Sequence, residues 1–397
     1  MGDVIPLQAQ ASPASVGLCP ERLAHLGAVF REEVAAQKLP GGVLTIARHG
    51  KLVHVDAFGR LDPQREEPMR SDAIFRIYSM TKPIVSVAAM MLVERGRLLL
   101  SQPAAHWLPE LADLRMAPPQ EGDVGMPPHR PVTVQDLLRH TAGFSYEFSG
   151  SDAIHRQYAA AKLFSRGLGS AEFTRALARI PLVHQPGTAW CYSHATDVLG
   201  RLIEVVDGAR SLGQFLQAEI FEPLGMLDTA FHVPEAQAHR LAEPFNRDPD
   251  TGRPVRVFDV RRPMPHEMAG AGLVSTAADH ARFMQMLLSG GVLGESRLLG
   301  PKTIQLMTAD HLGDIPVTGT FLAPGHGFGL GFAVRLAPGI AAGAGSAGMY
   351  YWGGLAGTSF FIDPQEGLHA QLMIQQPGRR DHYRELFREL VYAAVLD

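Results

Sequence analysis

The sequence predicts an α+β fold of two lobes, with an antiparallel sheet flanked by N- and C-terminal helices and a helix-rich lobe inserted between. Two observations predict it: β-rich segments lie towards both ends of the 397-residue chain, and helical patterns dominate the middle. The chain is long enough for one large or two closely packed domains. We therefore assign residues 1–78 and 266–397 to a discontinuous α/β lobe and residues 79–265 to the helix-rich lobe.

The N-terminal elements are expected to be a helix followed by a β-hairpin. Apolar residues recur at helical spacing between residues 20 and 37, and the Pro-Gly-Gly sequence at 40–42 stops that helix. Residues 43–47 and 52–58 are rich in strand-forming residues and are joined by the turn sequence at 48–51. The first strands of the sheet therefore follow directly after the first helix.

The middle of the chain is expected to consist of helical segments between loops. The predicted helices span residues 80–95, 133–140, 196–207 and 211–221. Thr133 is a start signal for one of them, and Gly96 and Gly208 are stop signals for two others. The stretches 117–131 and 243–265, rich in proline and glycine, are better explained as loops around a site than as domain linkers.

The C-terminal part is expected to return to the sheet. Thr276 is suited to cap a helix that has Asp279 at its third position, and the glycines at 290–291 would end that helix. Predicted strands follow at residues 328–335, 349–352, 358–363 and 368–374. Residues 381–396 form the last predicted helix, so that both ends of the chain contribute to the α/β lobe.

Composition argues against several classes of function. The net charge is −4 and the five lysines are scattered, which gives no basic surface for nucleic acid. Cys19 and Cys191 are the only cysteines, so neither a disulfide framework nor a cysteine-based zinc site is expected. The 17 histidines show no metal-ligand spacing, and nucleotide-binding, zinc-peptidase and lipase-elbow motifs are missing, so no metal or cofactor is expected.

Signals for membranes and export are lacking in the sequence. No run approaches the roughly 18 apolar residues that would span a bilayer. The N-terminus has neither a basic start nor an apolar core of signal-peptide length, which predicts a cytoplasmic protein, although a periplasmic or secreted origin stays open. The sequence does not indicate an oligomeric state.

The segment YSMTK at residues 78–82 is the first candidate for chemistry. Pro83 suits the first turn of the helix predicted at 80–95, which places Ser79 at the helix N-terminus. Unpaired backbone N–H groups and the helix dipole favour negative charge there, and Lys82, one turn on, directs its amine back towards the hydroxyl. Ser79 and Lys82 are thus a candidate nucleophile and base; the alternative is a helix cap followed by a solvated lysine.

Two further stretches would complete such a site. In AWCYSHATD, Tyr192 precedes a helix, and a tyrosine acts as a general base only if a cation such as a lysine lowers its pKa. In YYWGGLAGTSFFID, Gly353 and Gly354 let backbone approach a ligand, and the Leu355 N–H would complete an oxyanion hole with the N–H of Ser79. The alternatives are a core aromatic beside a capping turn and an ordinary glycine turn.

These stretches occur in the order and at the broad spacing of the serine β-lactamase and penicillin-binding protein superfamily. The segments LLRHTAGF (137–144), EIFEPLGMLDT (219–229), GAGLVSTAADHARFM (270–284) and HGFGLGF (326–332) also resemble its class C branch. Within that branch, IYSMTKPI together with WGG is most similar to the family VIII carboxylesterases. The resemblance implies a two-lobed β-lactamase-like fold with the active site in the cleft between the lobes.

The resemblance also implies the roles of individual residues. Ser79 matches the nucleophile of the superfamily, Lys82 its lysine and Tyr192 its tyrosine. Class C β-lactamases have Tyr-x-Asn where this chain has Tyr-Ser-His at 192–194, and Lys-Thr-Gly where it has Trp-Gly-Gly at 352–354. The lost lysine would pair with an antibiotic carboxylate, so a neutral ester is the better substrate.

We therefore expect a serine carboxylesterase that hydrolyses small or short-chain acyl esters through a covalent acyl-serine intermediate, with weak β-lactam hydrolysis left open as a side activity. The expected partner is a small-molecule ester. The expected substrate-binding residues are Trp352, Gly353, Gly354, His194 and Tyr146, with Trp352 favouring a small acyl group and Tyr146 placed on the alcohol side. The alternatives are a β-lactamase, an acyltransferase or an amide or D-peptide hydrolase with the same residues, and a non-catalytic cell-wall-binding module.

Overall fold

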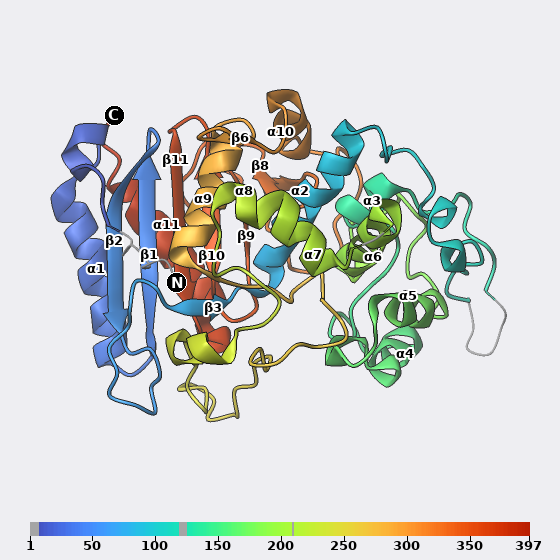
Figure 1. Ribbon diagram of the computed structural model, residues 1–397, viewed down its shortest axis with the longest axis horizontal. Coiled ribbons are helices and arrows are strands. Elements are labelled where there is room, and N and C mark those ends of the chain that lie inside the picture. Colours follow the sequence, from blue (N-terminus) through green and yellow to red (C-terminus); the bar gives the residue numbers. More distant parts are fainter. Residues whose placement is uncertain (1–7, 119–124, 209) are drawn as a thin grey trace.

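A large antiparallel sheet organises the structure. The computed structural model describes residues 8–118, 125–208 and 210–397; predictions that concern residues 1–7 and 119–124, at the N-terminus and within the loop 117–131, lie outside these ranges. Within the described ranges, this sheet has seven strands in the order β2-β1-β11-β10-β9-β8-β7 (Figure 1). Neighbouring strands are antiparallel throughout. The two ends of the chain therefore build one sheet.

The strands come from the segments that flank the helical middle. The large sheet contains β1 (Gly41–Arg48), β2 (Lys51–Gly59), β7 (His326–Phe328), β8 (Ala333–Arg335), β9 (Tyr350–Gly353), β10 (Ser359–Asp363) and β11 (Leu368–Ile374). A separate pair, β3 (Ile74–Arg76) and β4 (Val274–Thr276), joins the segment before the predicted insertion to the segment after it. Another small hairpin is formed by β5 (Val292–Leu293) and β6 (Ser296–Arg297). The lobe boundaries at residues 78 and 266 remain a prediction.

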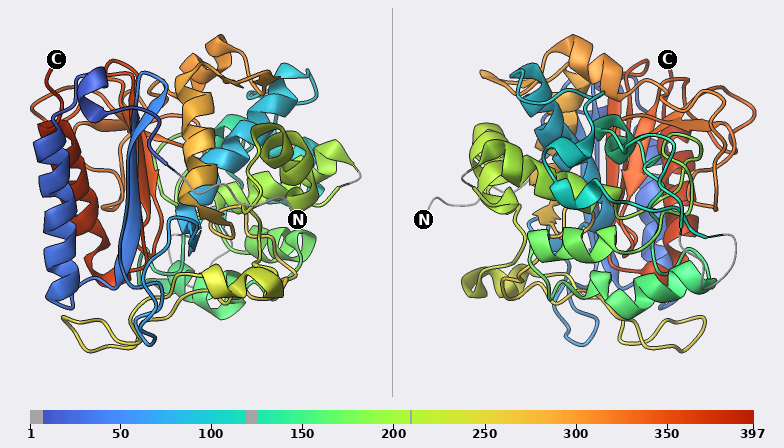
Figure 2. Two further views of the ribbon diagram at one scale, coloured as in Figure 1. Left: turned by 60° about the vertical axis from the view of Figure 1, so that its left-hand side comes forward. Right: turned by 90° about the vertical axis from the view of Figure 1, so that its right-hand side faces the viewer.

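The helices cover both faces of the sheet. Helices α1 (Pro20–Ala35) and α11 (Arg380–Ala393) lie side by side on one face, and α9 (Ala277–Leu288) packs on the other (Figure 2). The remaining helices are α2 (Thr81–Glu94), α3 (Val134–Leu138), α4 (Ala153–Ala161), α5 (Ser170–Ala178), α6 (Ala195–Asp207), α7 (Leu212–Leu216), α8 (Glu222–Leu224) and α10 (Pro301–Met307). In the described part of the chain, no helix is both long and apolar enough to cross a bilayer.

One hydrophobic core lies between the sheet and the helices α1 and α11. Leu26 and Phe30 of α1, Phe361 of β10 and Phe387 of α11 are almost completely buried there. Complete burial of a side chain of this size contributes about 1.5–3 kcal/mol. Strand β1 is buried along its whole length, which indicates that the sheet is covered on both faces.

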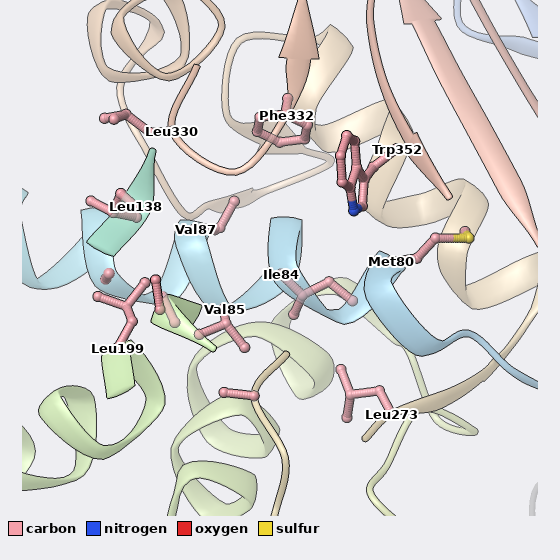
Figure 3. Packing of buried hydrophobic residues seen from close by; sticks show 14 of the residues in the cluster. Met80, Ile84, Val85, Val87, Leu138, Leu199, Leu273, Leu330, Phe332 and Trp352 are labelled. Atoms are coloured by element: carbon pink, nitrogen blue, oxygen red, sulfur yellow. The ribbon is translucent and has the colours of Figure 1, made fainter. Parts of the chain in front are cut away.

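Helix α2 runs through a second core on the opposite side of the sheet. Figure 3 shows Leu138 and Leu199 next to it on the helical side, with Phe332 and Trp352 on the sheet side. A helix that is apolar all round is buried, and close packing prevents it from shifting without loss of contacts. Helix α2 is therefore a rigid support for the YSMTK segment at its N-terminus.

The predicted start and stop signals act as expected. Thr133 forms a capping box with Asp136 at the start of α3, and the Thr276 hydroxyl accepts a hydrogen bond from the Asp279 N–H at the start of α9. Gly208 ends α6 with a φ of 85°. The predicted helices at 20–37, 196–207 and 381–396 are confirmed as α1, α6 and α11.

Two predicted elements are wrong in detail. Residues 328–335 are not one strand, because the chain turns between β7 and β8 at Gly331, which has a φ of 99° and would place a Cβ 2.3 Å from the Ser86 hydroxyl. The helix predicted at 211–221 is α7 followed by a π-helical turn, Gln217–Phe221. Helices α4, α5 and α10, of nine, nine and seven residues, are missing from the prediction.

Candidate active site

Ser79 is the accessible residue of an otherwise buried segment. Every residue from 73 to 92 is buried except Ser79, which is partly exposed. It lies in a 3-10 turn, Tyr78–Met80, between β3 and α2. The preceding Tyr78 has a φ of 45°. A left-handed backbone at such a residue costs about 1–3 kcal/mol and persists only where the surroundings enforce it.

Tyr78 is held in this conformation by the loop at 243–265. Its hydroxyl accepts a hydrogen bond from the Phe258 N–H at 2.8 Å, and its ring centroid lies 4.9 Å from that of Phe258. Burial raises the pKa of Tyr78, so the hydroxyl stays neutral. The loop therefore fixes the turn that presents Ser79.

Lys82 is buried and directed at Ser79. Its Nζ donates to Ser79 Oγ at 3.4 Å and to the Gly270 carbonyl at 2.7 Å, and only 1% of the residue is exposed. The cap position of α2 is Met80, and no side chain accepts a hydrogen bond there. The alternative of a helix cap followed by a solvated lysine is therefore wrong. The long contact to Ser79 is usual for catalytic hydrogen bonds before substrate binds.

Tyr192 lies against the same lysine. Lys82 Nζ is 4.5 Å from the centre of the Tyr192 ring, and the Tyr192 hydroxyl accepts a hydrogen bond from the Trp352 indole N–H at 3.3 Å. Tyr192 is 6% exposed, so the same residue is both a core aromatic and the candidate base. Trp352 is also 6% exposed, and its polar contact in this structure is to Tyr192.

Tyr146 is a second tyrosine beside the lysine, with Lys82 Nζ 5.6 Å from its ring centroid. Burial raises the pKa of Tyr146 well above its ordinary value, and neighbouring Tyr192, Asp197 and Glu147 raise this pKa further. Tyr146 is therefore a neutral phenol at physiological pH. Its role in substrate binding remains a prediction.

His194 does not face a substrate, which corrects the prediction. Its ring is fully buried, with Nδ1 2.9 Å from Asp197 Oδ2 and Nε2 3.3 Å from Glu147 Oε2. Burial lowers the pKa of His194, but the two carboxylates outweigh burial and raise the pKa above its ordinary value. Burial also pushes the pKa of Asp197 upward, whereas His194 holds it below its ordinary value. Both ring nitrogens are thus engaged by carboxylates, and the charged forms of His194 and Asp197 stabilise each other.

Gly270 connects the His194–Asp197 pair to Lys82. Asp197 Oδ1 accepts a hydrogen bond from the Gly270 N–H at 2.8 Å, and the Gly270 carbonyl accepts the bond from Lys82. A Cβ at position 270 would lie 2.9 Å from Asp197 Oδ2, so glycine permits the close approach. Asp197 and Gly270 were not among the site residues predicted from the sequence. The three-residue spacing from His194 to Asp197 at a helix start was the available signal.

The glycine pair after Trp352 brings β9 against the turn that carries Ser79. A Cβ on Gly354 would lie 2.3 Å from the Ile77 carbonyl oxygen. The Thr358 hydroxyl donates to that same carbonyl at 3.3 Å. In the described chain, the N–H groups of Ser79 and Leu355 have no hydrogen-bond acceptor. Their use as an oxyanion hole remains a prediction.

Aromatic side chains continue outward from the catalytic candidates to the surface. Phe148 stacks on Tyr146 with ring centroids 4.8 Å apart, and Phe321 lies 5.0 Å from the Tyr192 ring. Phe148 is 52% exposed and Phe321 is 39% exposed, and their rings are 6.1 Å apart. We refer to Phe148 and Phe321 as the aromatic rim. They offer apolar surface next to the reactive groups.

A second serine has a triad-like arrangement but is not accessible. Ser145 Oγ lies 3.0 Å from His155 Nε2, and His155 Nδ1 lies 2.8 Å from Asp152 Oδ1. Ser145 is only 1% exposed, so a substrate carbonyl has no approach to its hydroxyl. Ser145 is therefore a suitable control for Ser79.

Neither a metal-binding cluster nor a disulfide is found among the described residues. Among the described residues, no three or more histidine, cysteine, aspartate or glutamate side chains are grouped so that they could hold a metal ion. Cys19 and Cys191 are both free thiols, and burial raises the pKa of Cys191.

Comparison with known proteins places the chain in a family. The sequence profile described as Beta-lactamase matches residues 26–393. Esterase EstB from Burkholderia gladioli is 32% identical over 399 residues, which cover 93% of this chain and 95% of that protein. A protein of Mycobacterium tuberculosis is 39% identical over 363 residues, with 88% of each chain covered.

Solved structures agree with this assignment. EstCE1, described as a hydrolase with promiscuous acyltransferase activity, superposes with a TM-score of 0.79 at 27% identity and covers 94% of this chain and 99% of its own. A penicillin-binding protein homologue from Caulobacter crescentus has a TM-score of 0.70 at 26% identity, with 95% and 99% covered. The predicted β-lactamase-like fold is confirmed. The chain belongs to the beta-lactamase family and, within the serine β-lactamase and penicillin-binding protein superfamily, to the family VIII carboxylesterases.

Proposed function

We propose that the protein is a serine carboxylesterase that hydrolyses small neutral esters through an acyl-serine intermediate. The observation that supports this most strongly is the contact between buried Lys82 and Ser79, the one accessible residue of its segment. The similarity to Esterase EstB and to the hydrolase EstCE1 supports the same reaction class.

In the acylation step, Ser79 Oγ bonds to the ester carbonyl carbon while its proton passes to Lys82 and Tyr192. The carbonyl oxygen becomes an oxyanion that accepts hydrogen bonds from the N–H groups of Ser79 and Leu355. The bond to the alkoxy oxygen then breaks, and the alcohol leaves with the proton. Because Lys82 Nζ lies 4.5 Å from the centre of the Tyr192 ring, we treat the two residues as one acid–base unit.

In the deacylation step, the same groups act on water. The Lys82–Tyr192 unit takes a proton from a water molecule, whose oxygen bonds to the acyl carbon. The second tetrahedral intermediate uses the same two N–H groups. Its bond to Ser79 Oγ breaks, Ser79 recovers the proton, and the carboxylic acid is released.

A neutral ester suits the Trp-Gly-Gly sequence at 352–354 better than a β-lactam does. Trp352 stands where class C β-lactamases have a lysine, and its indole N–H is used by the Tyr192 hydroxyl. A substrate carboxylate would therefore lack a lysine partner at this position. We expect slow hydrolysis of nitrocefin, and rapid turnover of it would favour a β-lactamase instead.

Short acyl groups are the proposed substrates. The acyl side is bounded by Trp352 and Tyr192, which are both buried and close-packed, with ring centroids 5.3 Å apart. Long chains would have to displace these rings, and interiors this dense resist displacement. A p-nitrophenyl ester series of increasing acyl length checks this, and equal turnover of acetyl and long-chain esters would contradict it.

Acyl transfer is a second candidate activity, because the aromatic rim offers an apolar surface on which an alcohol acceptor can displace water. EstCE1 is described as having promiscuous acyltransferase activity. Product analysis with p-nitrophenyl butyrate and an added alcohol tests this proposal. Formation of the new ester supports transfer, and formation of butyric acid alone excludes it.

The binding partner and the cellular location of the protein are proposed from sequence patterns. A small-molecule ester is the expected partner, and no nucleic-acid partner is expected. The cytoplasmic location stays a prediction, because it depends on the N-terminal sequence, of which residues 1–7 lie outside the described ranges.

The test of the proposed function is the loss of esterase activity in Ser79→Ala, with Ser145→Ala as the matched control. With p-nitrophenyl acetate and butyrate, Ser79→Ala should lower kcat/KM by about three decades or more, which is about 4 kcal/mol of transition-state stabilisation. Ser145→Ala should retain activity, since its hydroxyl is inaccessible. Loss in Ser145→Ala with retention in Ser79→Ala would overturn the assignment of the nucleophile.

A further inference from the structure

Arg384 reaches from helix α11 to the turn that follows strand β9. Its Nη2 donates to the Gly354 carbonyl at close range and to the Thr358 carbonyl at 3.4 Å, while Nη1 donates to Asp381 at 3.1 Å. The side chain is 27% exposed, and its Nε is buried without a partner among the described residues. A helix on the outer face of the sheet thus holds backbone next to Ser79.

The two glycines of the Trp-Gly-Gly sequence have different neighbours. A Cβ on Gly353 would lie 2.7 Å from Arg384 Cζ, so this glycine makes room for the guanidinium group. A Cβ on Gly354 would collide with the carbonyl of Ile77, which directly precedes the turn that carries Ser79. Gly353 therefore leaves room for the Arg384 side chain, and Gly354 leaves room for the turn that carries Ser79.

The contact with Arg384 fixes the orientation of one peptide group. The Gly354 carbonyl also accepts a hydrogen bond from the Gly357 N–H at 3.0 Å. In a trans peptide, the carbonyl and the N–H of the following residue point in opposite directions. Because Arg384 and Gly357 hold the carbonyl of Gly354, the Leu355 N–H is turned away from Arg384. That N–H has no acceptor in the described part of the protein.

We propose that Arg384 is a positioning residue for the oxyanion hole, because it holds the Gly354–Leu355 peptide with the Leu355 N–H available to the substrate oxygen. The inference rests on the proposed function, in which that N–H stabilises the oxyanion. Arg384 acts through this peptide and does not contact the reacting atoms. Its charge also polarises the carbonyl that it binds, which strengthens the N–H donor at the other end of the same peptide.

Several charged and titratable groups face Arg384. Asp381 and Arg380 lie on the same helix, and Tyr192 and Tyr351 act on it from other elements. Asp381 is 79% exposed, so its charge is largely screened by water. Burial lowers the pKa of Arg384 to about 10, which leaves the guanidinium protonated at neutral pH. The positive charge beside the Gly354 carbonyl is therefore retained during catalysis.

The variants that test this proposal are Arg384→Met, Arg384→Lys and Arg388→Met. Methionine removes the donors and the charge but keeps an unbranched apolar chain, and lysine keeps one charged donor. Arg388 is the matched control because it lies one turn further along α11 and packs over the Tyr351 ring, 5.6 Å from its centroid. All variants are assayed as full chains with p-nitrophenyl acetate and butyrate.

We expect Arg384→Met to lower kcat about 10- to 100-fold while KM changes less than about threefold, since removing an oxyanion donor outright costs about 10²–10³ in kcat. Arg384→Lys should recover part of this loss. Arg388→Met should stay within about twofold of the wild type, as expected for a residue outside the site.

Inhibition by a trifluoromethyl ketone separates positioning from general disorder. This probe forms a tetrahedral oxyanion on Ser79, so its Ki should rise in parallel with the loss of kcat in Arg384→Met. Thermal unfolding followed by circular dichroism shows whether each variant is folded. If Arg384→Met does not fold, Arg384→Gln replaces it in the same comparison of Ki with kcat. Its loss of kcat should be smaller, because glutamine keeps an amide group that can donate.

The inference would be overturned if the folded Arg384 variant had the same kcat and Ki as the control Arg388→Met. It would also be overturned if only KM rose in the Arg384 variant. An inactive wild type would instead overturn the proposed function. The two failures are therefore distinguishable in one set of assays.

Discussion

On the helical side of Ser79 the site is built from ionisable side chains, whereas on the sheet side it is built from backbone. Lys82 is buried between Ser79 and Gly270, and Gly270 is in turn hydrogen-bonded to Asp197 of the buried His194–Asp197 pair. Across from it, Arg384 binds the Gly354 carbonyl, and the next N–H, that of Leu355, has no acceptor among the described residues. In the proposed mechanism, the first side moves the proton and the second side stabilises the negative charge.

This difference implies two modes of failure. A side chain that transfers a proton fails when its functional group is removed, even if every backbone atom stays in place. A backbone donor has no functional group to remove, and fails when its peptide is displaced or turned. The helical side should therefore be sensitive to substitutions that preserve shape, and the sheet side to substitutions that add volume.

The largest effect is expected on the helical side, at Lys82 and Tyr192. Lys82→Met and Tyr192→Phe each preserve most of the buried volume, yet each should lower kcat/KM by about 10²–10⁴, the range typical of a general base. Because the two residues act as one unit, the double variant should be little worse than the poorer single variant. Steady-state assays of all three variants check this. Additive losses would mean that the two residues act in separate steps.

A comparable but smaller effect is expected on the sheet side from a single methyl group. Gly354→Ala places a Cβ 2.3 Å from the Ile77 carbonyl and the Thr358 hydroxyl. We expect kcat/KM to fall about 100-fold and the free energy of unfolding to fall by about 1–3 kcal/mol, since overpacking displaces backbone.

The matched control for this variant is Gly167→Ala. The φ of Gly167 lies outside the left-handed region, and a Cβ there would lie 3.6 Å from the Ser165 hydroxyl, which is normal contact. Its activity and stability should equal those of the wild type. A fully active Gly354→Ala enzyme would show that the sheet side tolerates displacement and would remove the distinction between the two sides.

The His194–Asp197 pair should make the free energy of unfolding depend on pH. The pKa of His194 is raised in the folded state, so its stabilising contribution is fully present below the unfolded pKa of about 6.5 and is lost as pH rises through the folded value. Asp197 has a lowered pKa, so its contribution is present above about 3.8 and is lost as pH falls through the folded value. The pair is therefore most effective in weakly acidic solution.

His194→Asn tests this dependence, with the exposed His25→Asn as the control. Urea unfolding should show a loss of about 3 kcal/mol for His194→Asn near pH 6, because Asp197 is left as an unpaired buried charge. The difference from wild type should shrink at alkaline pH. A difference that is constant with pH would mean that His194 contributes only neutral hydrogen bonds.

The smallest effect is expected at the aromatic rim, which both sides share. Phe148→Ala and Phe321→Ala remove exposed rings and leave the buried groups in place, so kcat should change less than about twofold. KM for esters of bulky apolar alcohols should rise about three- to tenfold, while KM for methyl esters should not change. A fall in kcat for the methyl esters would place the rim in the catalytic machinery.

The sequence predicted the helical side better than the sheet side. Ser79 and Lys82 lie within one helical turn, so local geometry brings them together, and the structure confirms their contact. The same local reasoning identified the caps at Thr133 and Thr276. It could not show that His194 is buried, because its partner Glu147 is 47 residues away in the chain.

Residue types and short-range spacing by themselves determined the candidate reactive groups, the alternation of helices and strands, and the family to which the chain belongs. The tertiary structure alone decided which groups are accessible and how the backbone donor is turned. The Lys82–Gly270 bond spans 188 residues and the Arg384–Gly354 bond spans 30 residues between a strand end and a helix. Such contacts follow from packing of the whole chain and leave no periodic pattern in the sequence. The Trp-Gly-Gly motif could therefore be recognised from the sequence, whereas Arg384, for which the first glycine leaves room, could not.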